Sequence, residues 1–244
     1  MSLSSCCVSG YLHEGTPSGK VEHFNGVKAY VATPSGDYDK TKALIFLTDI
    51  YGIDLPNGLL LADSFAKNGI PVYMPDMPNG DPIVPEDMQS GKITLQEWFG
   101  RHGKDATRPP IDAVIKGLKE QGVKEFAAIG YCWGARYVVD LVLEDIVKVG
   151  IVAHASLLEV PKDIEALDKK PAKFLWLMAS QDHLLNPDLQ KQVKEILKDN
   201  KNHSFSDFDA AHGFAIRGDP NNEKVRKEAD RAFEDSVKFI KANL

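Results

Sequence analysis

Three residues far apart in the chain have the types needed for nucleophilic catalysis: Cys132, Asp182 and His212. Cys132 is the centre of Gly130-Tyr131-Cys132-Trp133-Gly134, between an apolar run and a segment with helical periodicity. This pattern predicts a nucleophile elbow, a sharp strand-to-helix turn whose strained central residue leaves no space for side chains two positions away. The N-terminus of the following helix favours the thiolate, the form of cysteine that attacks.

Asp182 and His212 follow Cys132 in the order nucleophile, acid, histidine. Asp182 lies in Ser180-Gln181-Asp182-His183, after the apolar run 174–179, and His212 lies in Ala211-His212-Gly213-Phe214. This order is that of α/β hydrolases and differs from that of the other triad folds. We therefore interpret the three residues as a triad in which Asp182 orients His212 and His212 takes or stabilises the thiol proton. The alternative is that Cys132 is a small core residue between two unrelated glycines.

A tetrahedral intermediate on the nucleophile needs two hydrogen-bond donors for its oxyanion. The backbone N–H of Trp133, directly after the nucleophile, is one candidate, and that of Ile50, in the turn after the apolar run 43–48, is the other. Asp49 and Tyr51 flank Ile50 in the same turn, so we expect them near the substrate. Asp49 is either a turn cap or an acid that holds or releases the thiol proton as substrate binds.

Arg217 lies five residues after His212 and has two interpretations. Its guanidinium offers a planar fork of donors that could bind a substrate carboxylate. Alternatively, it is a solvated loop charge. The remaining histidines considered, His154, His183 and His203, are interpreted as packing or surface residues.

Alternating apolar runs and helical patterns predict a mostly parallel sheet with helices on both faces. Asn25-Gly26 suits a type I′ turn, so residues 21–32 are predicted to form a β-hairpin. Residues 75–91 are interpreted as an irregular loop of the kind that often covers a substrate. We expect an N-terminal segment, 1–20, and a single α/β domain, 21–244, with strands at 43–48, 70–74, 125–130, 147–155, 174–179 and 204–208 and helices at 56–68, 95–99, 111–121, 135–143, 187–198 and 223–242.

Composition excludes several classes of function. The chain has 244 residues and a net charge of −6, which gives no electrostatic basis for binding nucleic acid or an anionic membrane. No apolar run approaches the ~20 residues of a membrane span. Three cysteines do not form a disulfide framework, so a cytoplasmic protein is expected. The adjacent Cys6 and Cys7 are interpreted as ordinary thiols, although an acylation site, half of a metal site or a redox pair are alternatives.

The chain resembles the dienelactone hydrolase family of α/β hydrolases, which includes the carboxymethylenebutenolidases. The resemblance extends from Val27 to the last predicted helix. Its specific residues are Gly130-Tyr131-Cys132-Trp133-Gly134-Ala135, the surroundings of Asp182, and His212-Gly213-Phe214-Ala215. The N-terminal stretch is similar to eukaryotic, especially fungal, members in Cys6-Cys7, Gly10, His13, Gly15, Thr16 and Pro17.

This resemblance implies a cysteine hydrolase of small lactones or esters that uses no metal or organic cofactor. It also implies a carboxylate beside the oxyanion turn, where bacterial members have Glu and this chain has Asp49, one methylene shorter. Bacterial members have an Arg shortly after the strand that ends in Pro-Asp, and here Pro75-Asp76-Met77-Pro78-Asn79-Gly80 has none. Arg217 is shifted by one position relative to the family's Arg after the His. Both departures argue against dienelactone itself as the substrate.

The partner we expect is therefore a small ester or lactone, bound by a monomer or a homodimer. Two other functions fit parts of the sequence. A hydrolase fold can serve as a ligand-binding protein without catalysis, because a fold does not guarantee a function. A glycan hydrolase would need two carboxylates flanking a sugar, for which Asp49 and Asp182 could be proposed.

Overall fold

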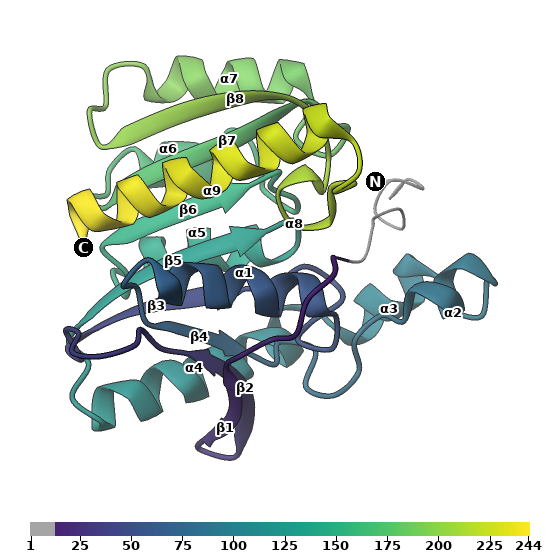
Figure 1. The fold of residues 1–244 in the computed structure, drawn as a ribbon. Coiled ribbons are helices and arrows are strands. Elements are labelled where there is room, and N and C mark those ends of the chain that lie inside the picture. Colours follow the sequence, from purple (N-terminus) through teal and green to yellow (C-terminus); the bar gives the residue numbers. More distant parts are fainter. Residues whose placement is uncertain (1–12) are drawn as a thin grey trace.

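The structure is a computed structural model that describes residues 13–244. A twisted sheet forms the centre of this part of the chain (Figure 1). Within these residues the sheet has eight strands in the order β1-β2-β4-β3-β5-β6-β7-β8. β1 pairs antiparallel with β2 and β2 with β4, and all other neighbours are parallel. The strands are β1 Lys20–Phe24, β2 Val27–Ala32, β3 Lys42–Leu47, β4 Val72–Pro75, β5 Glu125–Tyr131, β6 Val149–Ala153, β7 Lys173–Gln181 and β8 His203–Ala211.

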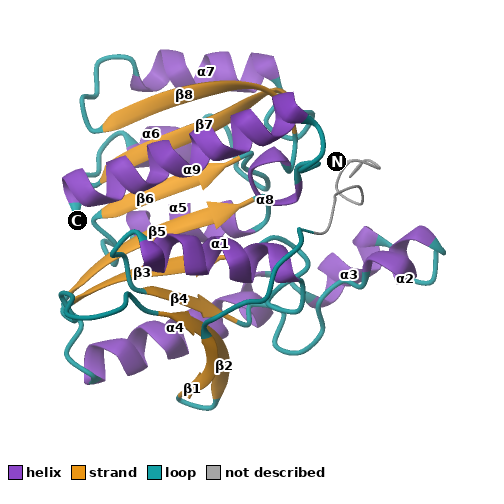
Figure 2. Cartoon of the chain, viewed as in Figure 1, coloured by secondary structure: helices purple, strands orange, loops and turns teal. Residues whose placement is uncertain are grey.

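Helices cover both faces of this sheet (Figure 2). On one face α1, α8 and α9 pack on strand residues such as Phe46 and Ile129. On the other face α4 to α7 pack on the alternate strand residues, such as Ile45 and Ala128. The helices are α1 Pro56–Lys67, α2 Pro85–Gln89, α3 Leu95–Arg101, α4 Lys104–Glu120, α5 Gly134–Leu143, α6 Lys162–Leu167, α7 Pro187–Leu197, α8 Phe214–Arg217 and α9 Glu223–Asn243. The predicted α/β class, with its mostly parallel sheet, is confirmed.

The predicted N-terminal hairpin is present as β1 and β2. Asn25 and Gly26 have φ values of 49° and 85°, as a type I′ turn requires, and Phe24 pairs with Val27 across the turn. Cys6 and Cys7 lie outside the described residues.

The helix predicted at 111–121 begins earlier than expected, at Lys104. Pro109 and Pro110 lie inside it and do not precede it. A proline cannot donate to the carbonyl four residues before it, and here those carbonyls belong to Asp105 and Ala106. Both residues are exposed in the first turns of the helix, where water can donate instead.

Three short helices were not predicted. α2 lies inside residues 75–91, which were expected to be irregular, and begins with Pro85 at its first turn. α6 and α8 span six and four residues, too few to show a helical period in the sequence.

Candidate active site

The turn after β5 has the geometry predicted for a nucleophile elbow. Cys132 has a left-handed φ of 52° and is 3% exposed, and α5 begins two residues later. A Cβ on Gly130 would come within 2.6 Å of the backbone oxygen of Gly134, and a Cβ on Gly134 would collide with the backbone oxygen of Leu47. Both glycines are therefore required by close backbone contacts, and the reading of them as coincidental is wrong.

The pairing of β7 with β8 brings Asp182 and His212 together. Gln181 pairs with Ala211, so the acid and the histidine each follow a paired residue at the same sheet edge. His212 Nδ1 donates to Asp182 Oδ2 at 2.9 Å, and the other carboxylate oxygen accepts from the Leu184 amide at 2.8 Å. Both side chains are almost completely buried. The imidazole is thus held in a fixed orientation by a carboxylate that is itself anchored.

His212 also responds to the charge of Cys132. Burial alone would lower the pKa of His212, but the charge of Cys132, the hydrogen bonds to Asp182 and Cys132, and the charge of Asp182 together raise it to about 10. The three side chains, separated by up to 80 positions in the sequence, therefore act on one another electrostatically. An imidazolium stabilised in this way favours a thiolate beside it.

The two predicted oxyanion donors lie just after the ends of two neighbouring strands. β3 and β5 pair with Leu47 opposite Gly130, so the chain leaves both strands at the same height. Trp133 follows one strand and Ile50 the other, and both are buried. Among the described residues, neither amide donates to a loop carbonyl or a side chain, which leaves both N–H groups for a substrate oxygen.

Asp49 and Arg217 form a second buried pair of charges. Arg217 Nη1 donates to Asp49 Oδ2 at 2.7 Å, and both side chains are 4% exposed. The interpretation of Arg217 as a solvated loop charge is therefore wrong. Its guanidinium carbon lies 5.3 Å from the centre of the Tyr51 ring. Gly213, with φ 90°, leaves space for this guanidinium, because a Cβ there would approach Arg217 Nη2 to 2.7 Å.

The interpretation of Asp49 as a turn cap is confirmed. It caps the turn, since its Oδ1 accepts from the Tyr51 amide at 3.1 Å. It also lies within the field of the nucleophile: burial raises the pKa of Asp49, Arg217 opposes this shift, and the charge of Cys132 raises the pKa further. The role of Asp49 in handling the thiol proton stays a prediction.

Two residues at the end of β6 were missed as members of the site. Ser156 Oγ lies 3.7 Å from Cys132 Sγ. The ring of His154, expected only to pack, meets the His212 ring edge to face at 4.8 Å, and His154 has a left-handed φ of 39°. Neither ring nitrogen of His154 has a hydrogen-bond partner among the described residues. β6 pairs with β5, so the residues that follow β6 lie near Cys132, which follows β5. Knowledge of the strand order would therefore have placed His154 and Ser156 at the site.

His183 lies near the candidate site, whereas His203 packs away from it. The His183 ring lies 5.8 Å from that of His212, at the margin of the site. His203 packs as predicted, and its Nδ1 accepts from Trp176 Nε1 at 3.2 Å. In the described part of the chain, no cluster of three or more His, Cys, Asp or Glu side chains could hold a metal ion.

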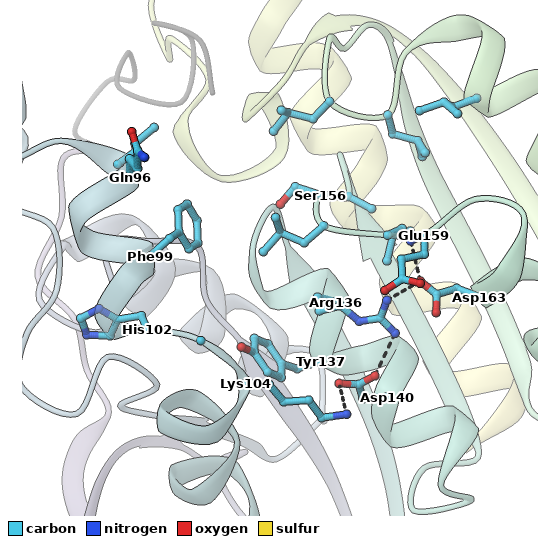
Figure 3. A pocket seen from close by; sticks show the side chains of 18 of the residues that line it. Gln96, Phe99, His102, Lys104, Arg136, Tyr137, Asp140, Ser156, Glu159 and Asp163 are labelled. Atoms are coloured by element: carbon cyan, nitrogen blue, oxygen red, sulfur yellow. Dashed lines mark hydrogen bonds and ion pairs between the residues drawn. The ribbon is translucent and has the colours of Figure 1, made fainter. Parts of the chain in front are cut away.

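A cavity of about 1220 Å³ lies among α2, α3, α5 and the segment after β6 (Figure 3). Figure 3 shows Phe99 and His102 on one wall and Arg136, Tyr137 and Ser156 on the other. The first wall is formed by α3, and the second by α5 and the segment after β6. Ser156 lines the cavity and its Oγ lies 3.7 Å from Cys132 Sγ, so this residue places the cavity next to the candidate site.

Known proteins resemble this chain in sequence over most of its length. The sequence model of the dienelactone hydrolase family matches residues 27–244. The hydrolase pyvD of Aspergillus violaceofuscus is 34% identical over 99% of this chain and 97% of its own length. A carboxymethylenebutenolidase homolog of Xenopus tropicalis is 31% identical over 88% of this chain and 83% of its own.

Solved structures show the same fold at low sequence identity. A dienelactone hydrolase-like promiscuous phosphotriesterase, P91, from metagenomic libraries has a TM-score of 0.70 at 16% identity, covering 93% of this chain and 98% of its own. The Pyrococcus furiosus esterase Pf2001 has a TM-score of 0.64 at 14% identity, covering 96% and 98%. The predicted α/β-hydrolase fold is thus confirmed. With a family match over nearly all the described residues, the chain belongs to the dienelactone hydrolase family.

Proposed function

We propose that the protein hydrolyses carboxylic esters or lactones through Cys132, His212 and Asp182. Membership of the family makes it a hydrolase of the ester and lactone class. The single observation that carries the assignment of residues is the buried His212–Asp182 hydrogen bond of 2.9 Å beside a cysteine with left-handed φ. A buried imidazole–carboxylate pair at a nucleophile elbow is the arrangement that activates such a nucleophile.

The reaction follows from these groups. The Cys132 thiolate attacks the carbonyl carbon, and the negative charge moves to the carbonyl oxygen, which the Trp133 and Ile50 amides stabilise. Protonated His212 gives its proton to the departing alkoxide, leaving a thioester on the sulfur. Neutral His212 then takes a proton from water, whose oxygen attacks the thioester and releases the carboxylic acid. Asp182 keeps the imidazole oriented in both steps.

The test is turnover of a short chromogenic ester, p-nitrophenyl acetate, by wild type and by Cys132→Ala. Loss of a nucleophile typically lowers kcat by about 10⁴-fold or more, so the variant should be near the uncatalysed rate. Circular dichroism and thermal unfolding show whether the variant is folded. Cys6→Ala/Cys7→Ala is the matched control for thiol loss and should keep its turnover. A folded Cys132→Ala enzyme with unchanged turnover would refute the assignment.

The alternatives predict other results. A ligand-binding protein would give no turnover, and iodoacetamide would label Cys132 no faster than a free thiol. For a glycan hydrolase, Asp49 and Asp182 would have to face the sugar. The structure gives this no support, because Asp182 holds His212 and Asp49 pairs with Arg217.

The cytoplasmic location and the monomeric or homodimeric state also belong to this proposal. A buried free thiol at Cys132 suits a reducing compartment. Among the described residues, no helix combines the length and apolar character needed to cross a bilayer. A fluorescent fusion and light scattering after size exclusion would test the location and the oligomeric state.

A further inference from the structure

Apolar side chains are the largest group among the residues that line the cavity next to Ser156. They come from α2, α3 and the residues between these helices, from the segment after β6, and from residues 184–189, which include the start of α7. The apolar lining residues are Met88, Ile93, Leu95, Phe99, Ala155, Leu157, Leu158, Leu184, Leu185 and Leu189. A surface of this composition gains free energy by covering an apolar group and offers little to a charged one.

The charged residues of the lining neutralise one another. Three cations, Lys104, Arg136 and Lys162, face three acids, Asp140, Glu159 and Asp163, so the described lining has no net charge. Each cation has an acidic partner. Figure 3 shows five of these groups, Lys104, Arg136, Asp140, Glu159 and Asp163, gathered away from Phe99.

Arg136 is the cation placed deepest in this wall. It bonds Asp140 at 2.8 Å and also contacts Asp163, and its side chain is 16% exposed. Lys104 and Lys162 are largely exposed, and they bond Asp140 at 3.1 Å and Glu159 at 2.7 Å. A substrate carboxylate would have to displace one of these acids, which gives the cavity no preference for an anion.

We propose that this cavity binds an uncharged ester or lactone through a bulky apolar part, aromatic or branched aliphatic, in preference to a carboxylated lactone. The proposal rests on the proposed function, because the apolar part must lie beside the carbonyl that Cys132 attacks. Ser156, which lines the cavity, lies 3.7 Å from the sulfur, and the cavity volume of about 1220 Å³ exceeds the range of about 300–1,000 Å³ that is usual for small-molecule sites.

Two p-nitrophenyl esters of equal acyl length test this preference. The valerate ends in a methyl group, and the hydrogen glutarate ends in a carboxylate. We expect kcat/KM for the valerate to exceed that for the glutarate by at least tenfold, and the 4-phenylbutyrate to be at least as good as the valerate. A glutarate preferred or equal to the valerate would overturn the proposal.

Leu157→Lys then places an unneutralised cation in the lining. Leu157 is 39% exposed with φ 59°, so an unbranched polar chain fits without new backbone strain. We expect the glutarate-to-valerate ratio of kcat/KM to rise at least tenfold. Leu157→Gln, polar but uncharged, and Val21→Lys, on the exposed face of β1, are the controls, and both should change the ratio less than threefold. An unchanged ratio in Leu157→Lys would contradict the proposal.

Binding separates this proposal from the proposed function. In Cys132→Ala, calorimetry measures the affinity for 4-phenylbutyramide and for glutarate monoamide, neither of which needs to react. Tighter binding of the phenylbutyramide, weakened by Leu157→Lys, supports the cavity even if no ester is turned over. Equal affinities together with normal ester turnover by wild type would overturn the cavity proposal and leave the hydrolase intact.

Discussion

Replacing Arg217 with Met leaves the Asp49 carboxylate buried without its guanidinium. Both side chains are 4% exposed and bonded at 2.7 Å, so water cannot substitute for the lost partner. Removing one member of a buried ion pair costs about 3–5 kcal/mol. With a urea m-value of about 3 kcal/mol per molar, the unfolding midpoint should fall by about 1–1.7 M.

The pH dependence of this loss identifies Asp49 as its cause. Burial already raises the pKa of Asp49 in wild type, and Arg217 opposes that shift, so the pKa rises further in Arg217→Met. An acid whose folded pKa lies above its unfolded value of about 3.9 stabilises the fold fully below that value. This stabilisation is lost as the pH rises through the folded pKa, by up to about 1.4 kcal/mol per pH unit. The variant should therefore be closer to wild type at pH 5 than at pH 8.

The assay is urea unfolding followed by tryptophan fluorescence at both pH values. Arg101→Met is the matched control, since Arg101 bonds Asp81 at 3.0 Å but both side chains are 52% exposed. Exposed pairs contribute about 0–1 kcal/mol, so the control should barely move the midpoint. The prediction for this buried pair is refuted if Arg217→Met lowers the unfolding midpoint no more than Arg101→Met does. It is also refuted if the loss of stability in Arg217→Met is the same at pH 5 and at pH 8.

Three further changes test the site. Asp182→Asn removes a charge that raises the pKa of His212 from its usual value to about 10, so the alkaline limb of the pH profile of kcat/KM should move to lower pH, with kcat reduced about 10²–10⁴-fold; an unmoved limb would contradict this coupling. Gly134→Ala places a Cβ against the last carbonyl of β3, and the expected destabilisation, about 2 kcal/mol or more, is measured by thermal unfolding. Asp49→Asn removes a charge that disfavours the thiolate, so iodoacetamide should label Cys132 at pH 7 at least as fast as in wild type; tenfold slower labelling counts against this role.

The sequence predicted the residues that local rules determine. The elbow glycines are required by contacts within five residues of Cys132 and with the adjacent β3, and the type I′ turn needs only Asn25-Gly26. The strands were predictable because buried parallel strands are continuous apolar runs. Pairing Asp182 with His212 needed only the chain order, because both follow runs that become neighbouring strands.

The remaining contacts depend on strand order and on side-chain packing, which local patterns do not contain. The burial of Arg217 against Asp49 joins residues 168 positions apart, and it requires the short helix α8 and the conformation of Gly213. His154 and Ser156 belong to the site only because β6 lies beside β5. The cavity is formed by four separate segments, so no single stretch of sequence could indicate its apolar lining.

The buried charges around Cys132 include that of Asp49, whose pKa is raised by burial and by the charge of Cys132. In the proposed mechanism, protonated His212 and Arg217 supply two positive charges, and Asp182 and the Cys132 thiolate supply two negative ones. The Asp49 carboxylate, although paired with Arg217 at 2.7 Å, adds a third negative charge to this buried group, which is costly. The charge of Cys132 raises the pKa of Asp49, and by linkage an ionised Asp49 must disfavour the thiolate to the same extent. Arg217, which pairs with the Asp49 carboxylate, therefore limits how strongly that carboxylate opposes a thiolate at Cys132.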